Sequence, residues 1–388
     1  MISEVPFSEP WITEEDKRAV LEALESRWLT GGNRAVEFEN TFADYIGTDC
    51  AVSVNSCTAA LHLAMRILDI GPGDEVIVPV LTFAATANAP IFCGARPVLV
   101  DVDEKKFTIS VEDLTKHITQ KTKAVIVVHY AGQSADMEEI LEVAEDNNLH
   151  VVEDCAHSLG SSYQGRMTGS LGEIGCFSFY ATKNITTAEG GMLVTNSRVL
   201  ADRARLLREH AMTKSAIERE KTGSWRYDVV DVGYNYRLNE IQAALGISQL
   251  KRMNEANQRR IEAAHYYSDR LKDEKGIRIP LEAGGRSHVF HLYVIRVIEE
   301  ESGVSRDELF DYLIRSGVGL SVHYTPLHLL TYYRRMFERC APHFEVAERL
   351  YKQIMSLPMF PTITRTQQDY VVDKILSGRS SCRNPAVG

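Results

Sequence analysis

Lys183 is the residue whose surroundings most suggest chemistry. It stands within residues 178–191, a run of small, aromatic and hydroxyl residues in which the only other charged side chain is Glu189. A lysine without charged neighbours is expected to be partly desolvated, which lowers its pKa and favours the neutral amine. A neutral amine can attack a carbonyl and form a Schiff base. Taken alone, however, such a lysine is more often a residue of an exposed loop.

Asp154, upstream of Lys183, is a second candidate. Val151 and Val152 continue a short apolar run that predicts a buried strand, and Asp154 stands where that strand should end. Ligands of open α/β sheets collect at the carboxyl ends of the strands. A carboxylate there can keep a pyridine nitrogen protonated while a lysine holds an aldehyde and moves protons, so the pair suits pyridoxal phosphate. By itself, Asp154 would more simply be a strand-end cap.

A phosphate group would need its own binding site, and residues 52–65 offer one. Ser56 and Thr58 mark the expected start of a helix, after a strand-like run and before apolar residues at helical spacing. Free backbone N–H groups at a helix N-terminus bind phosphate well. Ser178, just before Lys183, can add a hydroxyl from the other side. Ordinary N-capping would explain Ser56 and Thr58 equally well.

Short blocks in other parts of the chain add to these candidates. They lie at residues 56–61, 79–89, 153–157, 177–179, 182–183, 189–191 and 233–237. In this order they resemble the DegT/DnrJ/EryC1/StrS aminotransferases, which are sugar aminotransferases of fold type I. The resemblance covers about residues 8 to 376. Several blocks in the right order are a far more specific signal than any one of them.

The resemblance implies an α/β fold of type I, with a mostly parallel central sheet between helices and a smaller C-terminal α+β domain. We place the large domain, with an N-terminal arm, at residues 1–250 and the small domain at 251–388. Alternating strand and helix patterns agree with a parallel sheet. Strands are expected at 75–79, 96–100, 124–129, 150–153 and 290–297. Helices are expected at 135–146, 239–272 and 306–316, and a frayed tail at 378–388.

The resemblance also assigns roles around a pyridoxal phosphate cofactor. Lys183 would form the Schiff base and carry protons while the cofactor alternates with pyridoxamine phosphate, and Asp154 would pair with the pyridine nitrogen. Phe83 would stack on the ring, opposite Ala156. His157 would lie near the phenolic oxygen; otherwise it is a satisfied core histidine. The residues implied to hold the phosphate are Ser56, Cys57, Thr58 and Ser178.

Asn235 extends the implied site to a second copy of the chain. By resemblance, its side chain would reach the phosphate of the cofactor in the neighbouring subunit. The resemblance therefore implies a homodimer with shared active sites and an inactive monomer.

Cys57 departs from the family pattern, because many relatives carry glycine between the positions that match Ser56 and Thr58. Glycine lets a backbone approach a ligand closely, or allows a positive φ. Cysteine can replace it only where the backbone is ordinary helical or extended. A nucleophilic role is a further interpretation of Cys57, although a cysteine at a helix start is more often there for packing.

Residues 322–328 resemble the sugar-binding segment of the family. His323 and Tyr324 could contact the sugar or its diphosphate, and His328 could face the cofactor. Arg237 could hold an anionic group across the subunit interface. The substrate-binding residues implied in this way are Trp28, Thr30, Gly31, Arg237, His323, Tyr324 and His328.

The implied reaction is a ping-pong transfer of an amino group from L-glutamate to a nucleotide-linked keto-sugar in amino-sugar and polysaccharide biosynthesis. A likeness of residues 325–333 to enzymes that act on 4-keto-6-deoxy sugars favours amination at C4, and amination at C3 stays open. Related sugar dehydratases carry histidine at the lysine position, so Lys183 argues against that activity. A regulatory protein that binds pyridoxal phosphate without turnover is an alternative of another class.

The composition agrees with such an enzyme. The chain has 388 residues, 44% hydrophobic and 25% charged, as is ordinary for a soluble globular protein with two domains. Its net charge of −10 speaks against general nucleic-acid binding. No apolar run is long enough for a membrane span. The seven cysteines show neither metal spacing nor a disulfide framework, which favours a reducing cytoplasm and no bound metal.

Overall fold

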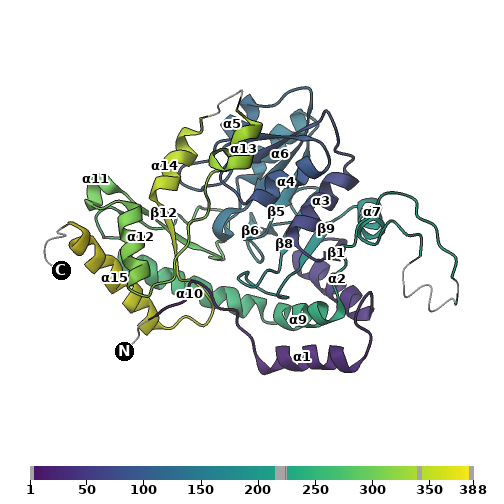
Figure 1. The fold of residues 1–388 in the computed structure, drawn as a ribbon, viewed down its shortest axis with the longest axis horizontal. Coiled ribbons are helices and arrows are strands. Elements are labelled where there is room, and N and C mark those ends of the chain that lie inside the picture. The colour runs from purple at the N-terminus through teal and green to yellow at the C-terminus, as the bar shows by residue number, and fades with distance from the viewer. Residues whose placement is uncertain (1–3, 215–222, 224, 339–342, 384–388) are drawn as a thin grey trace.

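The central element of the fold is a seven-stranded sheet with the order β1-β9-β8-β5-β4-β2-β3. Figure 1 shows β1, β5, β8 and β9 of this sheet surrounded by helices. The computed structural model describes residues 4–214, 223, 225–338 and 343–383. All neighbouring strands are parallel except where β9 pairs antiparallel with β1 and β8. The strands are β1 (Cys50–Val54), β2 (Glu75–Pro79), β3 (Arg96–Val100), β4 (Thr122–Val128), β5 (His150–Asp154), β8 (Ile174–Ser178) and β9 (Gly191–Thr195).

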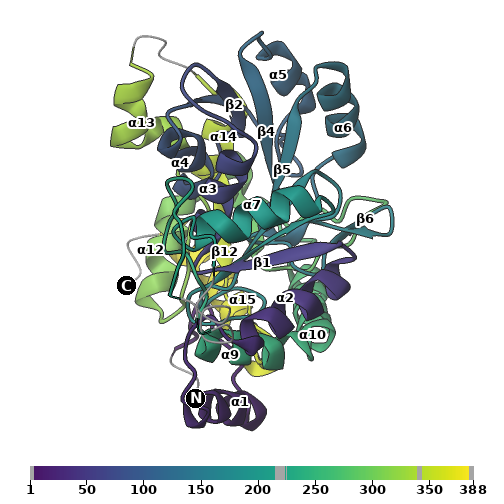
Figure 2. The ribbon, with the colours of Figure 1, turned by 90° about the vertical axis from the view of Figure 1, so that its right-hand side faces the viewer.

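Helices cover both faces of this sheet, and α5 and α6 lie across β4 and β5 from α3 and α4 (Figure 2). Successive residues of a strand point to opposite faces. In β2, Val76 and Val78 pack with α3 and α4, whereas Ile77 packs with α5 and α6. Both faces are thus buried, which explains the continuous apolar runs. The helices are α2 (Asn33–Ile46), α3 (Cys57–Ile67), α4 (Ala84–Phe92), α5 (Val111–Lys116), α6 (Met137–Asp146) and α7 (Arg198–Arg208).

A second, antiparallel sheet of three strands lies in the C-terminal part of the chain, with the order β10-β11-β12. The N-terminal segment joins this part, because Val5 forms a parallel bridge with Val318. The elements here are β10 (Ile277–Arg278), β11 (Tyr293–Val297), α11 (Glu299–Ser302), α12 (Arg306–Arg315), η2 (Leu327–Leu329), α13 (Thr331–Met336), α14 (Glu345–Gln353), β12 (Ile354–Leu357) and α15 (Arg365–Arg383). Short elements of the large sheet's loops are η1 (Tyr130–Gly132), β6 (Ser162–Tyr163) and β7 (Arg166–Met167).

The long helix expected at 239–272 is wrong, because the structure has two helices, α9 (Glu240–Leu250) and α10 (Met253–Leu271). The break falls at Arg252, whose guanidinium donates to the buried Asp16 carboxylate at 2.9 Å. Asp16 belongs to α1 (Glu14–Glu25), which packs along α9 at the edge of the molecule (Figure 1). The helix is therefore interrupted by a contact with a distant part of the chain.

The expected fraying from Gly378 onward is also wrong for the part of the tail that the structure describes. Helix α15 continues to Arg383, and residues 384–388 lie outside the described residues. A Cβ on Gly378 would lie 2.5 Å from Tyr312 of α12, so the glycine allows the two helices to pack closely. The Arg379 guanidinium donates to Glu274 at 2.8 Å. In the described residues, no helix is both long and apolar enough to span a membrane.

Candidate active site

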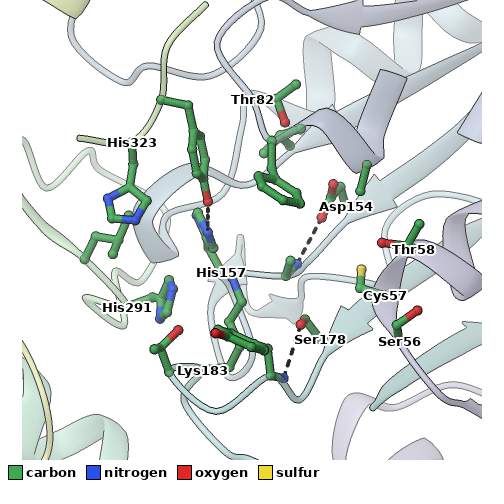
Figure 3. Close-up of a pocket in the computed structure, with 18 of the residues that line it drawn as sticks. Ser56, Cys57, Thr58, Thr82, Asp154, His157, Ser178, Lys183, His291 and His323 are labelled. Atoms are coloured by element: carbon green, nitrogen blue, oxygen red, sulfur yellow. Dashed lines mark hydrogen bonds between the residues drawn. The ribbon is translucent and has the colours of Figure 1, made fainter. Parts of the chain in front are cut away.

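A cavity of about 400 Å³ opens at the carboxyl ends of the parallel strands. Val128, Asp154 and Ser178, the last residues of β4, β5 and β8, all line it. The N-terminus of α3 forms the wall opposite a group of histidines (Figure 3). The expected position of a ligand site in an open α/β sheet is this edge.

Asp154 is held in the cavity wall by two hydrogen bonds. Thr86 Oγ1 donates to Oδ2 at 2.9 Å, and the amide of Ala156 donates to Oδ1 at 3.2 Å. Burial raises the pKa of this carboxyl, while these hydrogen bonds and the charge of Lys183 act in the opposite direction. The described residues hydrogen-bond no cationic side chain to it, so a cation bound in the cavity would stabilise its charged form.

Lys183 lies in the same cavity and is partly exposed to it. Desolvation lowers its pKa to about 8, although the neighbouring Asp154 and Cys57 favour the charged form. The backbone holds the residue in a turn, since its amide donates to the Tyr180 carbonyl at 2.9 Å. The low pKa agrees with the desolvation expected from the sequence and leaves much of the amine neutral slightly above neutral pH.

The start of α3 forms a cradle of backbone amides. Ser56 is the N-cap, and its hydroxyl accepts from the Ala59 amide at 3.1 Å, so the amides of Cys57 and Thr58 are not used by this cap. The first residue of the neighbouring strand β9 must be glycine, because a Cβ on Gly191 would lie 2.5 Å from the carbonyl carbon of Ser56. Ser178 faces the cradle across the cavity (Figure 3). An anionic group fits this arrangement.

Cys57 occupies this cradle without backbone strain. It is the first residue of α3, and its φ is not in the left-handed region. Glycine is therefore not required at this position. The side chain is buried, and burial, together with the nearby Asp154 carboxylate, raises the pKa of the thiol well above its usual value. A protonated thiol is a poor nucleophile, so packing is the role that the structure supports.

His157 and Tyr324 form a hydrogen-bonded pair above Lys183. The Ala131 amide donates to Nδ1 of His157 at 3.3 Å, so the proton of the neutral ring is on Nε2, which lies 2.8 Å from the Tyr324 hydroxyl. Burial lowers the pKa of His157 well below its usual value. Phe83 lies against Tyr324 with ring centroids 5.8 Å apart and is 60% exposed. These rings and Ala156 enclose the middle of the cavity.

His323 also lines the cavity. Its Nδ1 lies 2.8 Å from the Ser356 hydroxyl, and burial lowers its pKa to about 4. Phe7, from the N-terminal segment, stacks on it with ring centroids 5.6 Å apart. The amide of Met359 donates to the Phe7 carbonyl at 3.1 Å, so the first residues of the chain complete this wall.

Several residues expected at the site do not line this cavity in one copy of the chain. His328 instead lies 3.0 Å from Glu348, and Arg237 is paired with Glu209 at 3.2 Å. Thr30 forms an antiparallel bridge with Asn239 at the start of α9. The residues outside the cavity are Trp28, Thr30, Gly31, Asn235, Arg237 and His328. The structure therefore places His328 away from a cofactor in the cavity.

Other residues of the cavity were not identified from the sequence. Thr86 stands four residues after Thr82 on the first turn of α4, and this spacing could have drawn attention to a hydroxyl pair. Phe7, Ser8 and His291 carry no local motif, and only their long-range contacts bring them to the cavity.

His129, Glu153 and Cys155 form a buried group of metal-ligand type in the described residues. The Ala135 amide donates to Nδ1 of His129 at 3.1 Å, so Nε2 donates to Glu153 at 2.8 Å. The same carboxylate accepts from the amides of Gly169, Leu171 and Gly172. With its oxygens satisfied in this way, Glu153 orders the loop before β8.

Comparison with known proteins agrees with this geometry. The sequence model of the DegT/DnrJ/EryC1/StrS aminotransferase family matches residues 10–376. The spore coat polysaccharide biosynthesis protein SpsC of Bacillus subtilis is 43% identical over 373 residues, which cover 96% of each chain. PseC of Helicobacter pylori, an aminotransferase involved in the biosynthesis of pseudoaminic acid, is 33% identical with a TM-score of 0.91 over 97% of this chain and 100% of its own.

A putative sugar aminotransferase of Streptococcus pneumoniae, Spr1654, is similar to the same extent. Its pyridoxamine phosphate (PMP) form is 32% identical, with a TM-score of 0.91 over 98% of this chain and 100% of its own. Its pyridoxal phosphate (PLP) form has also been solved. The sheet topology and these neighbours confirm fold type I. The chain belongs to the DegT/DnrJ/EryC1/StrS aminotransferase family.

Proposed function

We propose that this protein is a pyridoxal-phosphate-dependent aminotransferase that moves the amino group of L-glutamate to a nucleotide-linked keto-sugar. The observation that carries the proposal is the low pKa of Lys183 in a cavity that also contains Asp154 and the α3 cradle. A sugar acceptor is supported by the names of SpsC and PseC, which refer to polysaccharide and pseudoaminic acid biosynthesis.

The residues of the cavity fit the cofactor. Asp154 is a buried carboxylate that needs a cationic partner, and a protonated pyridine nitrogen is one. The α3 cradle, with Ser178 opposite, suits the phosphate. Phe83 and Ala156 would lie against the ring. When bound, the cofactor supplies an electron sink for a carbanion.

Lys183 is the group that would carry the proton that is exchanged between a carbon of the substrate and a carbon of the cofactor. A base with a pKa near the working pH transfers protons efficiently in both directions, and the pKa of Lys183 is about 8. His157 and Tyr324 are neutral hydrogen-bonding groups, and the Tyr324 hydroxyl would orient a bound oxygen atom. The half-buried Tyr324 would exclude water from the reacting atoms, and the exposed Phe83 ring lies against it.

For the acceptor, we propose a 4-keto-6-deoxy sugar that is aminated at C4, with a C3 enzyme as the alternative. His323 and Tyr324 border the cavity and offer imidazole and hydroxyl groups to a sugar. Mass spectrometry of the products from a panel of nucleotide 3-keto and 4-keto sugars decides between the two.

Five free cysteines among the described residues agree with the reducing cytoplasm in which we expect the enzyme to act.

We also propose that two copies share their active sites. Asn235 and Arg237 lie outside the cavity of their own chain, as residues that serve a second copy would. At the rim of the cavity, Phe83 and Tyr180 are 60% and 48% exposed, and a partner could cover them.

Lys183 disfavours the alternative activity of a sugar dehydratase, because the related dehydratases carry histidine at this position.

The test of this function is spectroscopic. The purified protein with pyridoxal phosphate should absorb visible light, and borohydride should link the cofactor covalently to Lys183, as peptide mapping would show. Glutamate should convert the bound cofactor to its amino form. Binding without any spectral response to glutamate or glutamine would instead support a regulatory protein, and a colourless Lys183→Ala variant that still transaminates would refute the proposal.

A further inference from the structure

His291 is joined to helix α10 by a chain of buried amide side chains. Its Nδ1 lies 3.1 Å from Oδ1 of Asn184, the residue after Lys183. Nδ2 of Asn184 donates to Oδ1 of Asn257 at 2.7 Å, and Nδ2 of Asn257 donates to the Leu159 carbonyl at 3.0 Å. His291, Asn184 and Asn257 are 5%, 7% and 6% exposed, so water competes little for these hydrogen bonds.

The Leu159 carbonyl sets the direction of all these hydrogen bonds, because a carbonyl oxygen can only accept. Asn257 must therefore turn its NH₂ group to Leu159 and its oxygen to Asn184. Asn184 in turn must present its own oxygen to His291, so the proton of the neutral imidazole is on Nδ1. Nε2 of His291 is then an acceptor only.

Helix α10 also holds the backbone of His291. The buried Arg260, one turn after Asn257, donates from one nitrogen to the carbonyls of His291 at 3.4 Å and Met359 at 3.1 Å. A Cβ on Gly160 would lie 2.3 Å from Nδ2 of Asn257, so this glycine leaves room for the amide. The ring of His291 is thus fixed at its backbone and at Nδ1.

The ring lies in the cavity beside Lys183 (Figure 3). Among the described residues its Nε2 has no hydrogen bond, whereas Nδ1 is engaged by Asn184. Burial and then the charge of Lys183 lower the pKa of His291 well below its usual value. The other charged or titratable groups that act on it in the same direction are His157, Arg260 and His323.

We propose that His291 is a positioning residue for Lys183, in which the unprotonated Nε2 accepts a hydrogen bond from the lysine ε-amino group once substrate has displaced it, and Asn184 and Asn257 impose the required tautomer. With one N–H held in this way, the lone pair of the amine is directed to the substrate. The inference rests on the proposed function for its role, but the tautomer follows from the hydrogen bonds alone.

An ordinary core histidine provides the comparison. His288 is buried three residues earlier, and the Phe290 amide donates to its Nδ1 at 3.0 Å, so its proton is on Nε2. His288 does not line the cavity. His157 has the same tautomer as His288. His291 is thus expected to differ from both.

The first test is nitrogen NMR of the cofactor-free protein with labelled histidine, assigned with single variants. We expect His291 to be protonated at Nδ1 and His288 to be protonated at Nε2 in the same spectrum. A proton on Nε2 of His291 would overturn the proposal whether or not the protein is an aminotransferase. The tautomer itself is read from the unsubstituted protein, and the variants serve only to assign its signals.

The second test changes Asn184 to the isosteric Asp. A carboxylate facing Nδ1 favours the imidazolium, so in Asn184→Asp Nε2 of His291 becomes a donor and cannot accept from Lys183. We expect the half-reaction with glutamate to slow by about 10- to 100-fold at neutral pH, with unchanged affinity for glutamate, and to recover as the pH rises. Asn254→Asp makes the same change one turn before Asn257, where Asn254 only accepts from Tyr45, and should have no effect.

The outcomes separate the two proposals. An Asn184→Asp enzyme with the pH profile of the unchanged enzyme would overturn the role of His291 while the aminotransferase proposal stands. An unchanged protein that does not react with glutamate overturns the proposed function and, with it, the role of His291. The tautomer, read from the spectrum, stands or falls separately.

Discussion

A lysine with a pKa of about 8 changes its charge within the pH range in which proteins are ordinarily studied. Because the neutral amine is the form that attacks an aldehyde, we expect the association rate of pyridoxal phosphate with the cofactor-free protein to rise with pH and level off above about 8. Stopped-flow absorbance measures this rate, with Lys183→Ala as the blank. A rate that still rises toward the pKa of an ordinary exposed lysine would contradict the low pKa.

Asp154 shows a conflict between stability and function at the scale of one residue. Burial raises the pKa of Asp154, so the folded cofactor-free protein binds a proton there more tightly than the unfolded chain does. Above that pKa the carboxylate is charged and buried, and this charge lowers the free energy of unfolding. In Asp154→Asn, the amide can accept from Ala156 and donate to Thr86 Oγ1. We therefore expect an unchanged or higher free energy of unfolding at pH 7, and activity lower by about 100- to 1,000-fold.

Urea unfolding of the cofactor-free protein and steady-state kinetics test the two halves of this prediction. The conservative Asp154→Glu variant keeps the charge but moves it, and serves as the control for charge alone. A strongly destabilised Asp154→Asn protein would mean that the carboxylate supports the fold.

At the scale of the elements, the start of α3 depends on the strand beside it. In Gly191→Ala, the new methyl group would lie 2.5 Å from the carbonyl carbon of Ser56 and 2.6 Å from the Cys57 amide nitrogen, so α3 must shift. We expect a loss of about 1–3 kcal/mol in the free energy of unfolding. Because the displaced amides form the cradle, cofactor affinity measured by absorbance titration should fall as well.

Gly71→Ala is the matched control for this substitution. Its Cβ would have its nearest neighbour at 4.0 Å, and its φ is not in the left-handed region. It should leave both quantities nearly unchanged. Equal effects of the two substitutions would show that the cradle does not depend on close packing of β9.

The elements differ in how well the sequence predicts them. The strands at 75–79 and 96–100 have the predicted bounds, because each is a largely apolar run that follows a local turn signal, the Gly-Pro-Gly-Asp segment at 71–74 or Gly94. The break between α9 and α10 has no such signal: neither glycine nor proline stands there, and the cause is Asp16, far away in the sequence. The closely packed end of α15 likewise depends on its contact with α12.

The same distinction holds for the candidate site. Asp154 ends β5, Ser56 caps α3, and Lys183 stands in the loop of small and hydroxyl residues between β8 and β9, so local patterns locate all three. Phe7 and His291 are brought to the cavity only by the folding of distant segments. His328 is the reverse case, because the motif suggests a place near the cofactor, whereas its ring lies outside the cavity and 3.0 Å from Glu348.

At the scale of the whole molecule, shared active sites make a prediction for mixed dimers. Lys183→Ala and Asn235→Ala should each be inactive alone, since each removes one half of both sites. In a mixed dimer, one site receives both substitutions and the other receives neither. Random mixing should restore about a quarter of the unsubstituted activity. Activity assays after denaturation and joint refolding measure this, and the absence of any recovery would refute sharing.

The N-terminal segment has a consequence for the life of the chain as it is made. Val5 is fully buried beside Val318, and the Phe7 carbonyl accepts from the Met359 amide at 3.1 Å. The segment of Val5 and Phe7 is therefore translated long before its partners, Val318 and Met359. The cavity wall stays open until Met359 has been translated, so cofactor loading is an event that follows synthesis of that distant segment.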